Sequence, residues 1–278
     1  MNSKEKLWTI GVTSLIAIIA ILAVFPLFSL LISSLRPSSD LMRSGITLSI
    51  PFEKLNLNNY TYIFSEAGNY WDWYINSLII SAFTIVLCLF FSSMVGYALA
   101  VYEFKGNRFI FILVLLILMI PFEILMLPLY QFMIKIQMVD TYLAVILPMI
   151  VAPVAVFFFR QYASGLPKDL MESARMDGCT EYGIFFRIMA PLMLPSFAAM
   201  AILQGLSSWN NFLWPLVVLR SNSMFTLPVG LATLLTPYGN NYDVLIAGSV
   251  MTVLPVIILF LFFQRFFIEG LTVGGVKG

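Results

Sequence analysis

Long apolar stretches dominate the chain, and the segments between them hold all but one of its charged residues. A helix that crosses a bilayer needs about 20 mainly apolar residues. Six stretches meet this requirement, and only the third contains a charged residue, Glu123. They run over residues 7–35, 73–102, 109–134, 141–159, 188–219 and 244–264. The pattern predicts an all-α integral membrane protein with six transmembrane helices, the first and fifth stretches being long enough to include interfacial turns.

Composition supports a membrane protein. Soluble domains carry about 25% charged residues, whereas this chain of 278 residues carries 10% and is 60% hydrophobic. The net charge of +1 provides no basic surface for nucleic acid. The chain has no histidine, and its two cysteines, Cys88 and Cys179, lie in an apolar and a charged segment respectively. We therefore expect free thiols, with no disulfide framework and no metal site.

The distribution of basic residues predicts the orientation. Six crossings divide them into two alternating sets of 10 and 5, and cytoplasmic loops carry the excess of Lys and Arg. The larger set contains Lys4, Lys6, Lys105, Arg108, Arg160, Lys168, Arg175, Arg187, Arg265 and Lys277, and the smaller contains Arg36, Arg43, Lys54, Lys135 and Arg220. Both termini are therefore expected in the cytoplasm, and the first apolar stretch is too long for a cleaved signal peptide.

The inner segment 160–187 is unlike the rest, because its 28 residues hold 8 of the 29 charged residues. Pro167 suits the first position of a short helix, and Gly178 suits the left-handed residue that ends one. Thr180 can cap a second helix, with Glu181 in its first turn. We expect two short amphipathic helices, with Leu170, Met171 and Ala174 on the apolar face of the first and Phe185, Ile188 and Met189 on that of the second. Such helices must pack on something, either the base of the membrane domain or another protein.

The same segment resembles a known motif. The run Glu172-Ser173-Ala174-Arg175-Met176-Asp177-Gly178-Cys179, followed by Phe185, Ile188, Pro191, Leu192 and Pro195, is similar to the EAA loop of ABC importer permeases. Ser173 and Cys179 replace alanines of that pattern, and both are small. The segments Trp209–Pro215 and Gln264–Gly278 resemble the carbohydrate-uptake branch, particularly the maltose-type second permease, and the likeness is nearly continuous from about residue 70.

This resemblance implies a coupling-helix loop between helices 4 and 5 that inserts into a cleft of a separate ATPase. Glu172, Ser173, Ala174, Asp177 and Gly178 are the ATPase-coupling candidates. Glu172 and Asp177 could form charge-assisted hydrogen bonds, and Ala174 could permit close approach. Alternatively, Glu172 could pair with Lys168 and Arg175 on a solvated helix face.

The resemblance also implies the partners. They are a homologous permease forming a heterodimer, two cytoplasmic ATPases, an extracytoplasmic solute-binding protein and a carbohydrate substrate. The chain has no G-x-x-x-x-G-K-[ST] phosphate loop, so ATP and Mg²⁺ are expected in the partner ATPases and no cofactor in this chain. The implied location is the cytoplasmic membrane of a bacterium or archaeon.

Polar residues near the fifth span are candidates for the substrate path. Gln204, Ser208 and Asn211 are spaced to share one helical face, and Asn210 lies beside them. Amides beside the aromatic rings of Trp209 and Trp214 suit a carbohydrate, although hydrogen bonds between helices explain the same stripe.

Glu123 is a further candidate for the path. Counted along a straight helix from Phe109, it lies about 21 Å into a core of about 30 Å. Pro121 and Pro128 suggest a distorted helix there, so a cavity-lining or gate residue is expected, with proton coupling as the alternative.

Three domains are expected, with boundaries at 1–70, 71–269 and 270–278. The first outer loop, about residues 36–72, is rich in Asn, Tyr and Trp and fits an aromatic belt or a docking surface. The C-terminal tail could reach the ATPase interface or be frayed. An ion-gradient-driven secondary transporter is the main alternative function, and a membrane enzyme is a weaker one. The sugar stays open between disaccharides, oligosaccharides and glycerol-phosphate-like cargo.

Overall fold

The computed structural model describes residues 3–37, 53, 55–65, 68–236, 239–240 and 242–275, with side chains as far as Gln264 at the C-terminal end. The described chain is helical apart from one antiparallel pair of two-residue strands, β1 (Leu235–Thr236) and β2 (Gly239–Asn240), in which Leu235 pairs with Asn240. The chain divides into two compact units, residues 1–70 with 231–254, and residues 71–230 with 255–278. The helix α15 (Tyr242–Gly275) begins in the first unit and ends in the second.

The first unit contains α1 (Ser3–Ser34) and α3 (Asn58–Ser65). Asn59 fixes one to the other, because its buried side-chain amide donates to the backbone oxygens of Ser34 at 2.8 Å and of Arg36 at 2.9 Å. The Tyr60 hydroxyl lies 2.7 Å from the Ser34 hydroxyl. The C-terminal part of the predicted outer loop is therefore a folded helix that packs on its own chain, while residues 38–52 lie outside the described residues.

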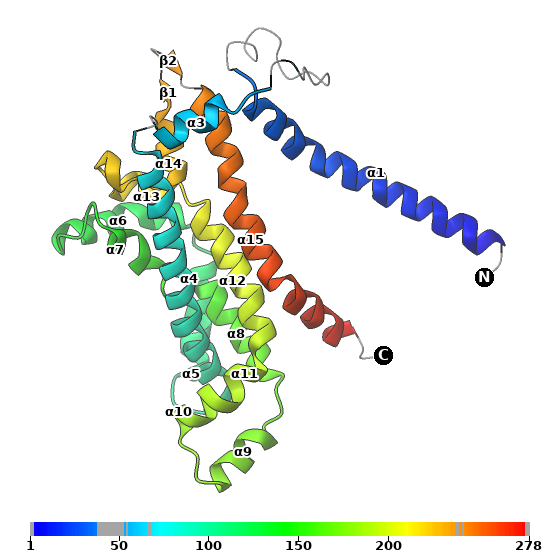
Figure 1. Ribbon diagram of the computed structural model, residues 1–278. Helices are drawn as coiled ribbons and strands as arrows, with labels where there is room; N and C mark the ends of the chain where they lie inside the picture. Colours follow the sequence, from blue (N-terminus) through cyan, green and yellow to red (C-terminus); the bar gives the residue numbers. More distant parts are fainter. Residues whose placement is uncertain are drawn as a thin grey trace. The chain divides into compact units, whose positions relative to one another are not determined.

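The second unit is a group of long helices with a short hairpin at one end (Figure 1). In this view α4, α8 and α12 run along the unit, the hairpin of α9 and α10 lies at one end, and α6, α7 and α13 lie at the other. The helices of this unit are α4 (Tyr70–Val101), α5 (Asn107–Leu118), α6 (Phe122–Lys135), α7 (Tyr142–Ile146), η2 (Leu147–Met149), α8 (Pro153–Ser164), α9 (Asp169–Met176), α10 (Glu181–Ile184), the π-helical η3 (Phe185–Met189), α11 (Ala190–Leu192), α12 (Leu194–Trp209), α13 (Leu213–Val218), η4 (Asn222–Met224) and α14 (Leu227–Thr233). The first residue of α4 and the last residues of α14 belong to the first unit.

Four helical segments among the described residues are long and apolar enough to cross a membrane. They are Trp8–Ser34, Tyr70–Val101, Tyr142–Ser164 and Tyr242–Gln264. Two further pairs pass the same test but are bent, α5 with α6 by 103° and Glu181–Leu192 with α12 by 76°. By length and composition the described chain therefore offers four candidate spans, or up to six if each bent pair crosses once.

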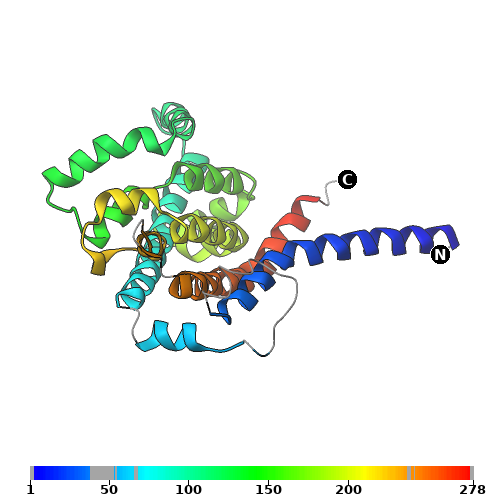
Figure 2. The ribbon, with the colours of Figure 1, turned by 90° about the horizontal axis from the view of Figure 1, so that it is seen from above.

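The third and fifth apolar stretches are consequently not single straight helices, which corrects the simplest interpretation of the sequence. Figure 2 shows the first correction, since α5 is seen nearly end-on while α6 runs across the view. Pro121 occupies the N-cap of α6, where a proline ends the preceding helix and is tolerated at the start of the next. In the fifth stretch the break at Met193 falls between Pro191 and Pro195, and both prolines sit in first-turn positions.

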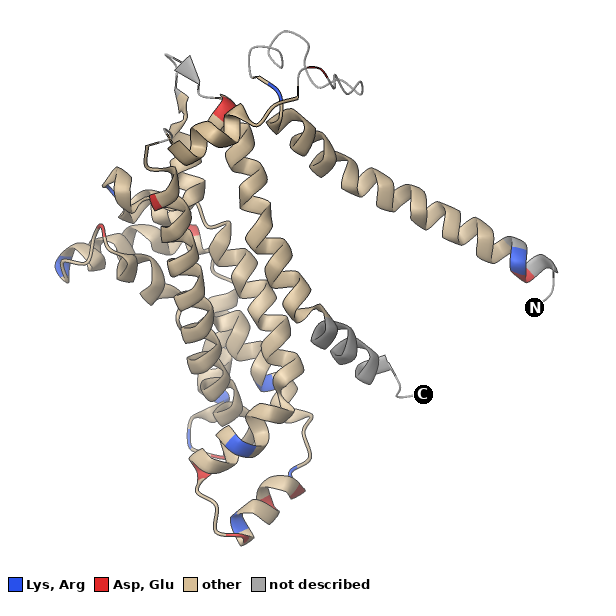
Figure 3. Cartoon of the chain, viewed as in Figure 1, with Lys and Arg blue, Asp and Glu red and all other residues tan. Residues whose placement is uncertain are grey.

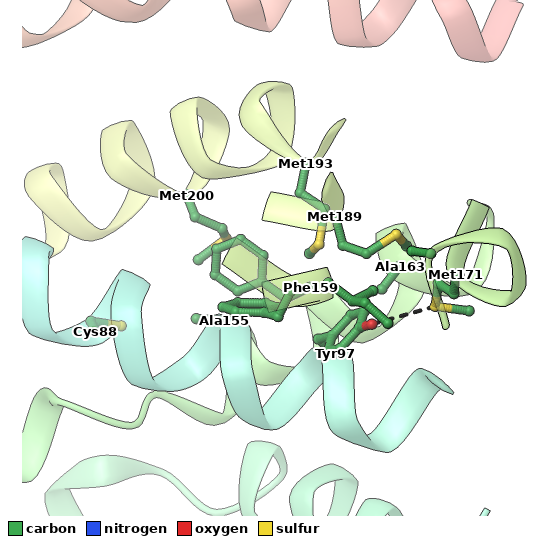
Figure 4. Packing of buried hydrophobic residues seen from close by; sticks show 12 residues of the cluster. Cys88, Tyr97, Ala155, Phe159, Ala163, Met171, Met189, Met193 and Met200 are labelled. Carbon is green, nitrogen blue, oxygen red and sulfur yellow. Dashed lines mark hydrogen bonds between the residues drawn. The ribbon is translucent and has the colours of Figure 1, made fainter. Parts of the chain in front are cut away.

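One hydrophobic cluster joins the hairpin to the long helices of the second unit (Figure 4). Its buried residues are Cys88, Tyr97, Ala155, Phe159, Ala163, Met171, Ala174, Ile184, Phe185, Met189, Met193 and Met200. Gly96 allows α4 to approach α8 closely, because a Cβ there would lie 2.8 Å from both the Cβ of Phe159 and the backbone oxygen of Val156. The hairpin therefore rests on a closely packed base.

The predicted C-terminal tail falls largely within α15, whose backbone is helical through Gly275. Residues 276–278 lie outside the described part of the chain.

Candidate functional site: the hairpin of α9 and α10

The backbone of the hairpin follows from a few local rules. Gly178 has a φ of +77°, the left-handed conformation that glycine adopts most easily. Its N–H donates to the oxygen of Arg175, and the N–H of Cys179 donates to the oxygen of Ala174, both at 3.0 Å. This pair of bonds is the Schellman ending of a helix. The prediction that Gly178 ends the first short helix is confirmed.

The second helix begins as the sequence predicts. Thr180 is its N-cap, and the threonine hydroxyl accepts a hydrogen bond of 3.2 Å from the N–H of Gly183. The prediction for Pro167 is wrong by two positions, because α9 begins at Asp169 with Lys168 as its N-cap. Proline still fits there, just before the helix, where no intrahelical amide is needed.

The apolar faces of the hairpin pack on the same chain. Met171 and Ala174 of α9 are each 4% exposed, and Phe185 and Met189 of the second piece are also buried. Leu170, expected on the same face as Met171, is 42% exposed. The burial of Ala174 corrects the expectation that its small side chain makes room for another protein, because it makes room for this chain's own core instead.

The other side of the hairpin is open. Four of the five coupling candidates, Glu172, Ser173, Asp177 and Gly178, are exposed. Two apolar side chains that sequence reasoning missed share this exposure, Met176 at 88% and Tyr182 at 72%. Figure 3 shows the charged residues of the hairpin against α4, α8 and α12, which are almost wholly uncharged. The hairpin therefore presents a charged and partly apolar outer surface, which suits contact with another protein rather than catalysis.

An ionic contact closes the break between α9 and α10. The Nε of Arg175 lies 2.7 Å from Oε1 of Glu181, and its terminal nitrogen lies 3.2 Å from Oε2. The Tyr102 hydroxyl, just after α4, donates to the same Oε2 at 2.7 Å. Arg175 thus pairs with Glu181 across the break. The alternative of a solvated helix face had supposed that it pairs with Glu172 along α9.

A second contact between the end of α4 and the hairpin lies inside the cluster. The hydroxyl of Tyr97 donates to the sulfur of Met171 at 3.3 Å, the dashed line in Figure 4. The ring of Tyr97 also lies 5.0 Å from that of Phe185 and 5.9 Å from that of Tyr102, measured between centroids. The end of α4 therefore contacts both halves of the hairpin.

The candidate substrate path near α12 is only partly brought together. Gln204 is buried and Ser208 is half-buried, both on α12. The helix ends at Trp209, and the side-chain amide of Asn210 donates back to the oxygen of Leu206 at 3.0 Å. Asn211 therefore lies beyond the helix, which corrects the expectation that Gln204, Ser208 and Asn211 share one helical face. Side-chain bonds of Asn to the backbone compete with helix continuation.

The two tryptophans of this region are core residues. Trp214 is fully buried, and its indole N–H donates to the oxygen of Ala144 at 3.0 Å. Trp209 is 6% exposed, with its ring 5.8 Å from that of Tyr74. The expectation that both rings present open faces to a sugar is wrong for this chain, because folding covers them.

Glu123 lies in the first turn of α6, and its side chain is exposed. Its predicted depth assumed a straight helix from Phe109, which the 103° bend between α5 and α6 rules out. A carboxylate in the first turn of a helix is favoured by the helix dipole.

Polar contacts that sequence reasoning missed hold the segment 220–227 at the opposite end of the unit from the hairpin. The side-chain amide of Asn76 on α4 donates to the oxygens of Ser223 at 2.8 Å and of Phe225 at 2.9 Å. The carboxylate of Asp140 accepts from the backbone N–H groups of Arg220 at 2.9 Å and of Ser221 at 3.0 Å. Asn76, a polar residue near the start of an apolar helix, was the available signal in the sequence. Its partners lie about 150 positions away along the chain.

Comparison with known proteins agrees with this architecture. Residues 92–272 match the model of the family described as "Binding-protein-dependent transport system inner membrane component". This range includes the hairpin and the polar residues near α12.

Two relatives match almost throughout. The arabinooligosaccharides transport system permease protein AraQ of Halalkalibacterium halodurans is 74% identical over 253 residues, which is 91% of each chain. The protein of the same name from Bacillus subtilis is 61% identical over 272 residues, 98% of this chain and 97% of that one.

A solved structure, that of a bacterial ABC transporter involved in the import of the acidic polysaccharide alginate, has the same fold, with a TM-score of 0.83 at 21% identity over 96% of this chain and 99% of that one. The match over residues 92–272 is more than half of the sequence, and the chain belongs to the family of binding-protein-dependent transport system inner membrane components.

Proposed function

We propose that this protein is the permease subunit of an ATP-driven importer that moves arabinose-containing oligosaccharides into the cell. The observation that carries the substrate is the 74% identity, over 91% of both chains, to a permease of an arabinooligosaccharide transport system. The family itself favours an ABC importer over an ion-gradient-driven carrier.

In this proposal the exposed side of the hairpin docks on a separate cytoplasmic ATPase. Glu172, Ser173, Asp177 and Gly178 contact that subunit, and Met176 adds an apolar side chain to the contact. Ala174 contributes from beneath, by letting α9 lie close to its own base. The exposure of the first group and the burial of Ala174 support this division of roles.

The assembly we propose contains this chain, a homologous permease, two ATPases that hold ATP and Mg²⁺, and an extracytoplasmic solute-binding protein. Each bent helix pair crosses the membrane once, which makes six crossings with both termini in the cytoplasm. Ten of the fifteen basic residues fall on the side that holds the hairpin and the loop before α5, and this asymmetry supports the orientation. The proposed domains are 1–70, a permease core over 71–269 and a short tail.

The proposed substrate path includes Gln204, Ser208, Asn210, Asn211 and Glu123. Asn210 and Glu123 are exposed in this chain, and Ser208 and Asn211 are half-buried, so side chains of all four reach the surface of the single subunit. Sugar hydroxyls would bind to their amide, hydroxyl and carboxylate groups. Since Trp209 and Trp214 are covered, stacking on a sugar would have to come from other aromatic residues or the second permease.

Uptake by the complete complex in sealed proteoliposomes tests the proposal. With the solute-binding protein outside and ATP inside, radiolabelled arabinotriose should accumulate, and a protonophore should not prevent it. A complex whose ATPase cannot hydrolyse ATP is the matched control and should show none. Accumulation driven by a proton or sodium gradient without ATP, or transport of maltotriose in preference to arabinotriose, would contradict the mechanism or the substrate respectively.

A further inference from the structure

We propose that Glu181 is a positioning residue, which fixes the docking hairpin to the end of α4 so that movement of the hairpin is passed to that helix. This inference rests on the proposed coupling role of the hairpin. The first route from the hairpin into the membrane domain is the chain itself, because α10 continues through η3 and α11 toward α12. The contact of Glu181 with the end of α4 adds a second route.

The carboxylate of Glu181 joins three separate pieces of the chain. It accepts two hydrogen bonds from Arg175 on α9, at 2.7 and 3.2 Å, and one from Tyr102 after α4, at 2.7 Å. A guanidinium that approaches a carboxylate with two nitrogens fixes direction as well as distance. The three groups therefore set the angle between α9 and α10 and, at the same time, their distance from α4.

Beside Glu181 the packing of the hairpin on α4 is incomplete. A cavity of about 310 Å³ lies beside Glu181, and its lining includes Met94 and Ala98 of α4 and Tyr182 and Phe185 of the hairpin. The cavity leaves room for the start of α10 to move against α4. Tyr102 and Glu181, which are joined by a hydrogen bond, both line this cavity, and Tyr97, which donates to Met171, lines it as well.

The exposure of the contact indicates a geometric role rather than a large stabilising one. The side chains of Arg175 and Glu181 are 42% and 46% exposed. Ion pairs in water contribute little to stability. Loss of this contact is therefore expected to leave the fold and the assembly intact, while the hairpin becomes loose against α4.

The test uses the whole complex and four variants of this chain. Glu181→Ala removes both the ion pair with Arg175 and the hydrogen bond from Tyr102, whereas Arg175→Glu removes the ion pair and sets a second carboxylate against Glu181, which pushes the Glu181 side chain away from its place beside Tyr102. The double variant Arg175→Glu with Glu181→Arg restores the opposite charges with their places exchanged, and the Tyr102 hydroxyl can then accept a hydrogen bond from the guanidinium at position 181. Glu103→Ala is the matched control, since it removes an exposed carboxylate directly beside Tyr102.

Two measurements are made on each complex after co-purification has shown that it assembles. The first is arabinotriose taken up per ATP hydrolysed in proteoliposomes. The second is the mobility of a nitroxide on Cys179, an exposed native cysteine between the two charged partners, in complexes whose other subunits lack exposed cysteines. Cys88 is buried and is not expected to react.

We expect uptake per ATP to fall by about two- to fivefold in both single variants, the change in population that the loss of one exposed ion pair produces. The nitroxide should become more mobile in the same variants. The double variant should recover both properties, and Glu103→Ala should match the unmodified complex.

The inference is overturned if Glu181→Ala behaves like Glu103→Ala, or if the exchanged pair fails to recover coupling. The second result would mean that Glu181 or Arg175 contacts the ATPase directly. If the unmodified complex shows no ATP-driven uptake, the proposed function fails, and the nitroxide measurement still decides whether the contact orders the hairpin.

Discussion

Substitution of Gly178 tests whether the hairpin depends on backbone conformation or on free space. Gly178 has a φ of +77°, and within the described chain a Cβ at this position would meet no atom within 4 Å. A larger side chain therefore meets no obstacle in this subunit. The cost of substitution comes from the left-handed conformation itself.

The expected effects follow from that conformation. An ordinary L-residue in the left-handed region costs about 1–2 kcal/mol. A cost of about 1 kcal/mol shifts the population of the correct hairpin about fivefold. Gly178→Ala should reduce uptake per ATP by about this factor, and Gly178→Val should reduce it further, because a β-branched residue is rarely found there. Gly178→Asn should be the mildest, since Asn is the residue that most often replaces Gly at this position of a helix end.

The assay is arabinotriose uptake and ATP hydrolysis in proteoliposomes, with expression and co-purification as controls for insertion and assembly. The order Asn, Ala, Val from mildest to most severe supports the backbone explanation. Asn being more harmful than Ala would refute it, because side-chain volume at an interface with the ATPase would then set the effect.

The remaining predictions concern packing, pH and substrate. Gly96→Ala should lower the melting temperature in detergent, at a cost of about 1–3 kcal/mol, because the added Cβ meets α8 at 2.8 Å; Gly11→Ala, which meets nothing within 4 Å, is the control, and equal melting temperatures would contradict the close contact. Burial raises the pKa of Asp140, but hydrogen bonds from Ser221 and Arg220 together outweigh it, so the net effect is a pKa below the ordinary value of 3.8. The stabilisation is therefore complete above about pH 4 and is lost as the pH falls through the folded-state pKa, so the deficit in melting temperature of Asp140→Ala should shrink at pH 3; a deficit independent of pH would argue against the carboxylate. Asn211→Leu should impair arabinotriose uptake while the complex still assembles, whereas loss of assembly would assign Asn211 to packing.

Local rules made the hairpin predictable. A Gly at the end of a short helix and a Thr before the next one act through bonds to residues within five positions, so the sequence alone specifies them. The pairing of Arg175 with Glu181 was missed although the two are only six positions apart. The left-handed turn at Gly178 brings them together, and helical spacing rules do not include such a turn.

Features that depend on distant partners were predicted less well. A tryptophan such as Trp214 can either stack on a sugar or pack in the core. Its contact with Ala144, 70 positions away, decides for the core, and the sequence does not reveal that contact. Pro121 signals a break in the third stretch, but the angle of 103° depends on what the two halves pack against. Asn211 was assigned to a helix that its neighbour Asn210 ends.

The bend after Leu118 constrains what can surround this protein in the bilayer. α5 has 12 residues and is about 18 Å long, well short of a hydrocarbon core of about 30 Å. In the proposed arrangement, in which α5 starts at one face of the bilayer, its last turn ends at membrane depth, where acyl chains offer no hydrogen bond to the carbonyl oxygens that a helix end leaves unpaired. Turns at Met119 and Ile120 satisfy two of these oxygens. In that arrangement, water or a neighbouring subunit rather than lipid tails is expected beside the carbonyl oxygens that these turns do not satisfy.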